Sequence, residues 1–155
     1  MRRKPHLSTI LGLGIIMAAT LVACGDDEPV DLRPSDVAAA GMVQEHPWEF
    51  FDGITEPVDD SDEVDVILAD QVIGGCGYDG SVTGNYVVFR LTPETGLHDV
   101  TVSFSEVDDS GFSFSAVESE VEITETADGA IFGSLDAERD EENYVEGDFA
   151  ALDCH

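Results

Sequence analysis

The feature that most constrains the fold of this chain is a period-two alternation of apolar and polar residues through its second half. Apolar residues recur with this spacing over residues 100–104, 112–116 and 117–123, and serine, threonine or glutamate stands between them. In an extended strand this spacing places the apolar side chains on one face. It therefore predicts antiparallel sheet with one buried side and one side that meets water. Helical periodicity is not sustained over three turns anywhere after residue 24.

Turn-forming residues separate these runs. Residues 92–96 combine proline with glycine, residues 108–111 join two alternating runs, and Asp128-Gly129 between apolar stretches is a strong hairpin signal. Residues 85–152 therefore predict a meander of about five strands, with about two or three more before it. We expect an all-β fold of about seven to eight strands, and the pattern leaves an antiparallel β-sandwich and a small barrel as alternatives.

Other segments fit the same fold class. Residues 48–51 are a short aromatic run whose tryptophan we expect in the core, and apolar residues alternate over 64–68. Residues 86–91 form a nearly continuous β-rich run, which predicts a strand covered on both faces. Residues 137–143 predict a loop between strands, with a helical turn as the alternative. Residues 145–151 predict a final strand that runs into Cys154.

The N-terminus has the three parts of a secretory signal. A basic head (Arg2, Arg3, Lys4) precedes an uncharged run over residues 9–23. The run ends in Leu21-Val22-Ala23, and Cys24 follows directly. The run has 15 residues. About 20 apolar residues are needed to span a bilayer. An ordinary signal peptide with Cys24 present by chance, and an uncleaved membrane anchor, are the alternatives.

These four residues in this context resemble the lipobox of bacterial lipoproteins, and the resemblance covers the first 24 residues only. It implies that the Cys24 thiol receives a diacylglyceryl group, that cleavage precedes Cys24, and that its new amino group is acylated, with chains such as palmitate. Several acyl chains on one residue anchor a protein stably to a membrane. Because Gly25 stands where lipoproteins of the inner membrane typically carry aspartate, we expect a cell-envelope location, at the outer membrane or cell surface if the cell is Gram-negative.

The expected organisation is a signal peptide over residues 1–23, an acidic tether over residues 24–44, and a β domain over residues 45–155. The tether opens acidic and contains two prolines, and a short helical turn over residues 36–40 is the structure we consider within it. The final strand, with Gly147, Phe149 and Ala151 before a cysteine, resembles the last strand of many uncharacterised secreted bacterial β domains. That resemblance implies no activity.

After removal of residues 1–23, the chain carries 34 Asp and Glu against three arginines (Arg33, Arg90, Arg139), a formal charge of −31 with no lysine. Such a surface repels nucleic acid and anionic headgroups, so we expect neither as a partner apart from the anchor at Cys24. A solvated surface suited to a saline habitat, calcium binding and a cationic protein or peptide partner all remain open as explanations.

The remaining two cysteines, Cys76 and Cys154, form an even pair in an exported domain, and we expect a disulfide between them. It would tie the final strand to the glycine-rich turn at residues 74–77. A metal site made of these cysteines with His155 and His98 is the alternative, although no CxxC or HxxxH spacing supports it.

The best candidates for a calcium site are the acidic stretch over residues 59–65 and the pair Asp108-Asp109. Asp60 and Asp62 fit an EF-hand loop, but a valine follows where an oxygen ligand is needed and Asp65 replaces the required glycine. Two interpretations remain: a calcium site of another kind, or a solvated acidic loop. The ligands of such a site would be Asp59, Asp60, Asp62 and Asp65.

Sugar-binding and catalytic signals are sparse. Four aromatic residues are candidates for stacking on a sugar ring, although one exposed ring does not form a platform: Trp48, Tyr78, Tyr86 and Tyr144. The chain has no nucleophile elbow, zinc-binding helix motif or phosphate loop, and His46, His98 and His155 are isolated. We therefore expect a non-enzymatic surface or binding domain without a cofactor, whose protein or glycan partner is unknown. A calcium- or glycan-binding module is the alternative, and an enzyme comes third.

Overall fold

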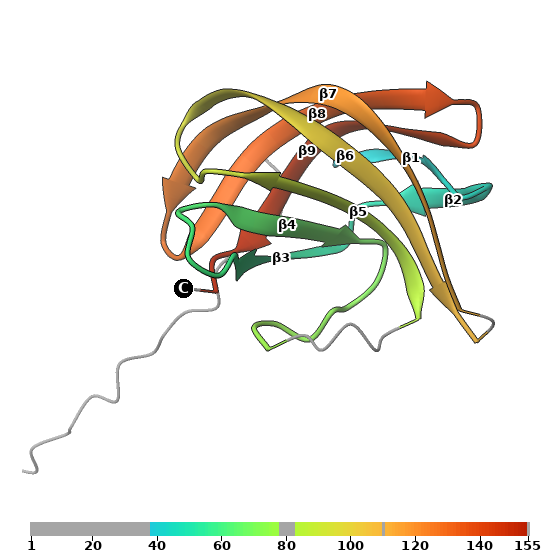
Figure 1. Ribbon diagram of the computed structural model, residues 1–155, viewed down its shortest axis with the longest axis horizontal. Coiled ribbons are helices and arrows are strands. Elements are labelled where there is room, and N and C mark those ends of the chain that lie inside the picture. The colour runs from blue at the N-terminus through green and yellow to red at the C-terminus, as the bar shows by residue number, and fades with distance from the viewer. Residues whose placement is uncertain (1–37, 78–82, 110, 155) are drawn as a thin grey trace, which may run out of the picture.

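The computed structural model describes residues 38–77, 83–109 and 111–154, which form β-strands and their connections (Figure 1). The strands are β1 (Ala40–Val43), β2 (His46–Glu49), β3 (Asp52–Pro57), β4 (Val64–Ala69), β5 (Gly84–Leu91), β6 (Gly96–Asp108), β7 (Gly111–Ala127), β8 (Ala130–Asp140) and β9 (Asn143–Leu152). The all-β class is therefore confirmed. The nine strands in the described part of the chain exceed the expected number because two short strands precede the barrel.

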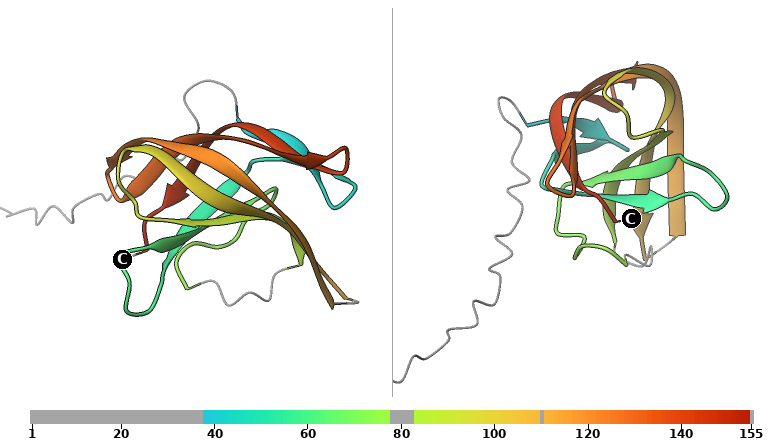
Figure 2. Two further views of the ribbon diagram at one scale, coloured as in Figure 1. Left: turned by 45° about the horizontal axis from the view of Figure 1, so that its top comes forward. Right: turned by 90° about the vertical axis from the view of Figure 1, so that its left-hand side faces the viewer.

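Strands β3 to β9 close into a seven-stranded barrel (Figures 1 and 2). Each strand from β3 to β8 pairs antiparallel with the next, which confirms the meander. β9 completes the wall by pairing antiparallel with β8 and parallel with β3, where Leu152 stands opposite Ile54. Of the two architectures that the alternation leaves open, the chain forms the barrel.

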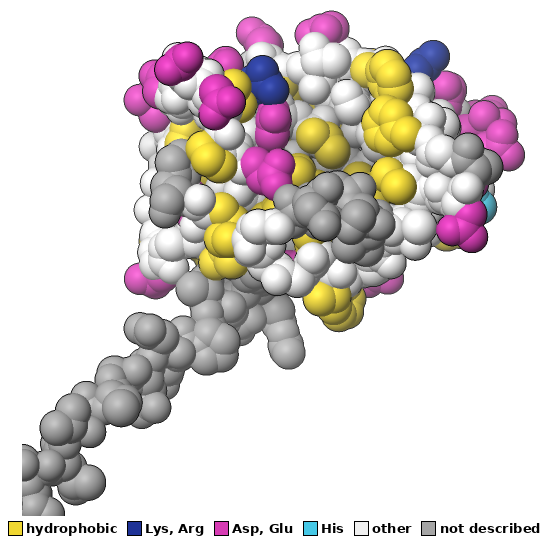
Figure 3. All heavy atoms as spheres, turned by 60° about the horizontal axis from the view of Figure 1, so that its bottom comes forward, with side chains coloured by type: hydrophobic (Ala, Val, Ile, Leu, Met, Phe, Trp, Pro, Cys, Tyr) yellow, Lys and Arg dark blue, Asp and Glu magenta, His cyan; other side chains and the backbone are white. Residues whose placement is uncertain are grey.

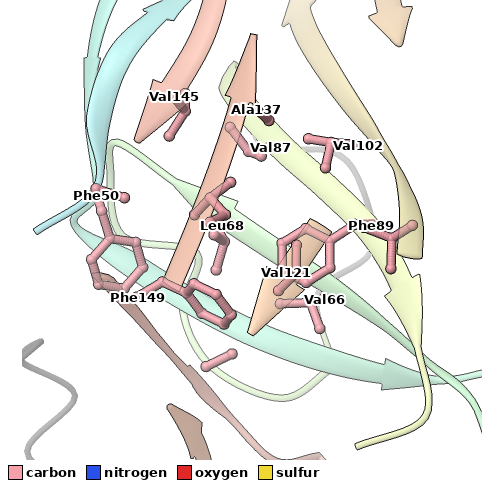
Figure 4. Packing of buried hydrophobic residues seen from close by; sticks show 14 of the residues in the cluster. Phe50, Val66, Leu68, Val87, Phe89, Val102, Val121, Ala137, Val145 and Phe149 are labelled. Atoms are coloured by element: carbon pink, nitrogen blue, oxygen red, sulfur yellow. The ribbon is translucent and has the colours of Figure 1, made fainter. Parts of the chain in front are cut away.

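Apolar side chains from the inward-facing positions fill the barrel, as expected for a barrel of this size (Figure 4). Phe89 of β5 and Phe149 of β9 meet edge to face, with ring centroids 5.5 Å apart. Val66, Val87 and Val102 pack around them and are fully buried. The core thus joins strands from both halves of the sequence. The expected cover on both faces of β5 is only partly formed, because its inward-facing apolar residues are buried whereas, on the outer face, Val88 is half-buried and Arg90 is exposed.

The predicted tether of residues 24–44 extends too far into the chain. Ala39 and Val43 are completely buried, and β1 pairs with the first half of β9. A Cβ atom at Gly41 would overlap the carbonyl oxygen of Tyr144, so the two backbones approach as closely as glycine allows. Residues 38–44 therefore belong to the β domain. The helical turn considered over residues 36–40 is not formed in residues 38–40.

The β1–β2 hairpin is fastened to the barrel by side chains. The Nε2 of Gln44 donates to the carbonyl oxygen of Phe104 (2.9 Å) and to the Oγ of Ser115 (3.2 Å). The indole of Trp48 is 2 % exposed and donates to the carbonyl oxygen of Asn85 at 3.0 Å. The core position expected for Trp48 is confirmed.

Two further predictions concern turns. Asp128 and Gly129 form the tight β7–β8 turn with φ of 54° and 74°, as their sequence predicts. The loop predicted over residues 137–143 is too long, because β8 continues to Asp140 and β9 begins at Asn143. Only residues 141–142 form the turn between them. Pairing between β8 and β9 continues through this acidic stretch up to Asp140 and Asn143, so its polarity marks an exposed strand end.

The expected disulfide between Cys76 and Cys154 is present, with Cα atoms 5.4 Å apart. It links the β4–β5 connection to the residues that follow β9. The backbone N–H of Asp153 also donates to the carbonyl oxygen of Gly129 at 2.7 Å. These two contacts hold the C-terminal end of the described chain against the barrel.

Candidate binding groove on the outer face of the barrel

The alternation of β7 changes phase halfway along the strand. Phe112, Phe114 and Ala116 occupy even positions, whereas Val117, Val121 and Ile123 occupy odd positions. Pairing with β6 is continuous, so the two sets lie on opposite faces of the strand.

The barrel interior takes the odd set, and Val121 and Ile123 are almost completely buried there. Expecting the two phenylalanines on the buried face, with serine toward water, was therefore wrong. Phe112 and Phe114 point outward, and Ser113 and Ser115 occupy the inward-facing positions.

The strand registers place these phenylalanines at the end of apolar rows on the outer face. One row runs across the sheet through Ala69, Tyr86, Ser105 and Phe114. Side chains directly opposite each other point to the same face of a sheet, so this row forms a band across four strands. This part of the outer wall is apolar, although an outer wall usually carries polar residues.

A groove of about 410 Å³ lies on this band. Its apolar lining is contributed by β4 to β7: Ile67, Tyr86, Val88, Val107, Phe112 and Phe114. Two hydroxyl side chains, Ser103 and Ser105, lie among them. The lining contains no charged side chain among the described residues. The groove therefore favours a ligand with an apolar body.

The floor and the rim of the groove differ in exposure. Tyr86 on the floor is 3 % exposed, whereas Phe112 and Phe114 on the rim are 64 % and 65 % exposed. The two rings stack with centroids 5.7 Å apart and an interplanar angle of 25°. Exposed apolar side chains of this size beside a groove are typical of binding surfaces.

The β4–β5 connection supports the floor. Gln71 donates through its Nε2 to the hydroxyl of Tyr86 at 3.4 Å and to the carbonyl oxygen of Thr83. Ile73 is buried in a second apolar cluster, with Ile54, Ile67, Ala69 and Tyr86. Its backbone N–H donates to Asp52 Oδ2 at 2.8 Å. Since Cys76 follows in the same connection, the disulfide holds the groove floor together with the C-terminal end of the chain.

Carboxylates gather on a different part of the outer wall. The registers align Asp99, Glu120, Asp136 and Glu146 in one row across β6 to β9, and we call these four residues the carboxylate row. Figure 3 shows hydrophobic side chains exposed on the side below β3 and β4 of Figure 1, with acidic side chains concentrated around its periphery. The surface thus divides into apolar and acidic regions.

The calcium candidates are not gathered into a ligand set. Asp65 lies on β4, where its carboxylate receives two hydrogen bonds from Arg90, from Nε at 2.7 Å and Nη2 at 2.8 Å. This contact raises the pKa of Arg90. Asp59, Asp60 and Asp62 lie in the β3–β4 loop. No group of three or more His, Cys, Asp or Glu in the described ranges is arranged to hold a metal ion.

The histidines and aromatic candidates are placed as follows. His46 lies 3.4 Å from a carboxylate oxygen of Glu106, and His98 contacts the carbonyl oxygen of Glu94 at 2.7 Å. Tyr144 is 41 % exposed, whereas Tyr86 forms part of the groove floor. His155 and Tyr78 lie outside the described residues.

Residues 1–37, which contain the lipobox and Cys24, also lie outside the described residues. In the part of the chain that is described, no helix is long and apolar enough to cross a membrane.

Comparison of the chain with known protein families, curated proteins and solved structures found no match. The groove was missed at the level of sequence, although a signal for it was present. The even-to-odd change of phase after Ala116 requires one apolar set to face outward if the strand is continuous.

Proposed function

We propose that the chain is a lipid-anchored protein of the bacterial cell envelope whose barrel is a non-enzymatic binding domain. The anchor is supported by the basic head, the short apolar run and Leu21-Val22-Ala23-Cys24 in that order. Acylation of Cys24 would hold the domain at the membrane, with the residues before Ala38 as a spacer. The resemblance to lipoproteins favours the outer membrane or cell surface.

The binding role is carried by the apolar groove on the outer face of β4 to β7. Its buried floor and stacked, exposed Phe112 and Phe114 offer contiguous apolar surface that a ligand would remove from water. Ser103 and Ser105 supply hydroxyls that would orient a polar group of the ligand. We therefore propose a ligand with an apolar body and few polar atoms.

The anchor is tested by expressing the full chain in a bacterium that processes lipoproteins. The protein should partition with membranes and begin at an acylated Cys24, as measured by fractionation and mass spectrometry. Cys24→Ser should leave the precursor uncut or release the protein. An unmodified N-terminus at another residue of the wild-type protein would refute the anchor.

The groove is tested with N-phenyl-1-naphthylamine, a neutral fluorescent probe that the acidic surface does not repel. The mature chain with Cys24→Ser should enhance its fluorescence, because the probe leaves water for the groove. Phe112→Ser with Phe114→Ser should weaken the enhancement about tenfold, since two exposed aromatic contacts are lost. Phe51→Ser is the matched control, because Phe51 is 65 % exposed but lies outside the groove. Equal effects of the two changes would contradict the proposal.

A further inference from the structure

The N-terminal half of β7 has one unpaired edge. β7 pairs with β6 along its whole length, but β8 joins it only from Glu120 onward. Beside Gly111–Ser119, no strand within the described ranges pairs on the side away from β6, and none of these residues is buried. We call this side of Gly111–Ser119 the β7 edge. In Figures 1 and 2 the β6–β7 tip diverges from the β8–β9 turn.

An unpaired strand edge is best matched by another extended chain. Every second residue along it presents its N–H and C=O groups outward, and only an extended backbone can pair with several of them at once. Adding a strand to such an edge is an established way for proteins to bind peptides. The side chains beside the edge then determine which peptide fits.

The outward-facing side chains of β7 change character along the edge. Phe112 and Phe114 lie near the hairpin tip, and Glu118 and Glu120 occupy the equivalent positions nearer β8. Glu120 stands between Asp99 and Asp136 in the carboxylate row. The edge is therefore apolar at its start and acidic at its end.

We propose that the β7 edge binds an extended cationic peptide antiparallel to β7, with basic residues at its N-terminal end and apolar residues at its C-terminal end. This inference rests on the proposed binding role of the groove, whose rim phenylalanines lie on the same strand. Antiparallel addition sets the basic residues beside Glu118, with Glu120 just beyond the edge where β8 pairs, and the apolar residues beside Phe112 and Phe114. The backbone supplies affinity, and these cross-strand pairs select the sequence.

Two other occupants fit the edge less well. A second copy pairing antiparallel through Ser115 would set Phe112 of each chain opposite Glu118 of the other, and it would bring two strongly acidic domains together. Residues 25–37 of the same chain carry five carboxylates and one arginine, so they repel the acidic end. Their two prolines also lack the N–H that a ladder needs.

The direction is tested with two synthetic peptides of one composition, acetylated and amidated at their ends. The basic-first peptide is Lys-Thr-Lys-Thr-Val-Thr-Phe, and the apolar-first peptide is its reverse. The basic-first peptide should bind the mature chain about tenfold more tightly by titration calorimetry, because only it matches both ends of the edge when antiparallel. Equal affinity, or preference for the reverse peptide, would overturn the proposal.

Strand addition itself is tested by N-methylation of the basic-first peptide. Only alternate amides of an added strand donate to the edge. Methylating the amides of odd-numbered residues and those of even-numbered residues, in separate peptides, should abolish binding in one case and preserve it in the other. Peptide binding should also slow amide exchange at alternate residues of Gly111–Ser119. Retained binding by both methylated peptides would overturn strand addition.

Variants separate the two ends of the edge and the two proposals. Glu118→Gln with Glu120→Gln should weaken the basic-first peptide about tenfold and leave N-phenyl-1-naphthylamine binding unchanged. The matched control is Asp59→Asn with Asp62→Asn in the β3–β4 loop, which also removes two charges but lies away from the edge. If the neutral probe binds but neither peptide does, the peptide proposal fails and the groove stands. If the peptides bind but the probe does not, the apolar ligand of the groove fails. A dimer in solution that depends on Phe114 would show that a second copy occupies the edge. That result would overturn the peptide proposal.

Discussion

The side chain of Asn143 joins the β1–β2 hairpin to the β8–β9 hairpin at one end of the barrel. Asn143 is 5 % exposed; its Oδ1 accepts from the backbone N–H of Gln44 at 3.1 Å, and its Nδ2 donates to Asp140 Oδ1 at 2.9 Å. Asp140 Oδ1 also accepts from the backbone N–H of Glu142 at 3.1 Å. The hydrogen bond from Asn143 is the main cause that lowers the pKa of Asp140 below its ordinary 3.8.

This lowered pKa predicts the direction of a pH effect. A carboxyl group whose pKa is lower in the folded state stabilises that state when ionised, so its contribution is complete above pH 3.8 and is lost as the pH falls through the folded value. Asp140→Ala should therefore lower the free energy of unfolding more at neutral pH than at acid pH. Urea unfolding across this range measures the difference, with Glu141→Ala in the same turn as control. If Asp140→Ala lowers the free energy of unfolding by the same amount at neutral and at acid pH, the prediction is contradicted.

At the scale of elements, β6 and β7 have two distinct roles. Their inward-facing residues belong to the core, as Phe104 shows with complete burial. Their outward-facing residues near the hairpin tip line the groove. The paired strands thus place residues of one chemical type in two environments, and residue type alone does not distinguish them.

A pair of substitutions measures this division. Phe104→Ala should lower the free energy of unfolding by about 3–5 kcal/mol, because it removes a buried ring and leaves a cavity. Phe114→Ala should change it by less than about 0.5 kcal/mol, because the ring is mostly exposed. Chemical denaturation of both variants tests the expectation. A cost for Phe114→Ala as large as that for Phe104→Ala would show that the β6–β7 tip belongs to the core.

At the scale of the whole molecule, closure of the barrel opposes electrostatic repulsion. The carboxylate row sets Asp99, Glu120, Asp136 and Glu146 side by side on neighbouring strands. Like charges directly opposite each other are destabilising. Burial of the apolar interior holds these strands together against that repulsion.

Salt should therefore raise the free energy of unfolding, and removal of one charge from the carboxylate row should have the same effect at low salt. Glu120→Gln should raise the free energy of unfolding by about 0.2–1 kcal/mol at low salt, and this gain should disappear in about 1 M NaCl, where the Debye length is about 3 Å. Asp62→Asn in the β3–β4 loop is the control. A gain that persists at high salt would exclude charge repulsion as its cause.

Calcium is tested separately at that high salt concentration. We expect millimolar Ca²⁺ to change the melting temperature little, because Arg90 occupies both carboxylate oxygens of Asp65, while the other candidates lie in the β3–β4 loop. A specific site would add binding energy that screening does not supply. A clear rise in melting temperature with Ca²⁺, abolished by Asp60→Asn with Asp62→Asn, would establish a calcium site in the β3–β4 loop.

The disulfide closes a long loop, and its loss acts on the whole domain. Replacement of Cys76 and Cys154 by serine should lower the free energy of unfolding by about 2–5 kcal/mol, because the unfolded chain regains conformational freedom. Peptide mapping without reductant should first find the two cysteines joined in the exported protein. Free thiols at both positions in protein purified from the cell envelope would refute the bond.

The sequence by itself determined the β class, the order of the last five strands and the turn at Asp128-Gly129, because these depend on alternation and local backbone preference. It also indicated the Cys76–Cys154 pairing, since only two cysteines were left to pair. The closure through Ile54 and Leu152, and the inclusion of β1 in the domain, depended on contacts between residues far apart in the chain. Only the tertiary structure decided which apolar set of β7 faces inward. Alternation assigns residues to two faces, but the closed barrel makes one of those faces the interior, and that choice left Phe112 and Phe114 beside the groove.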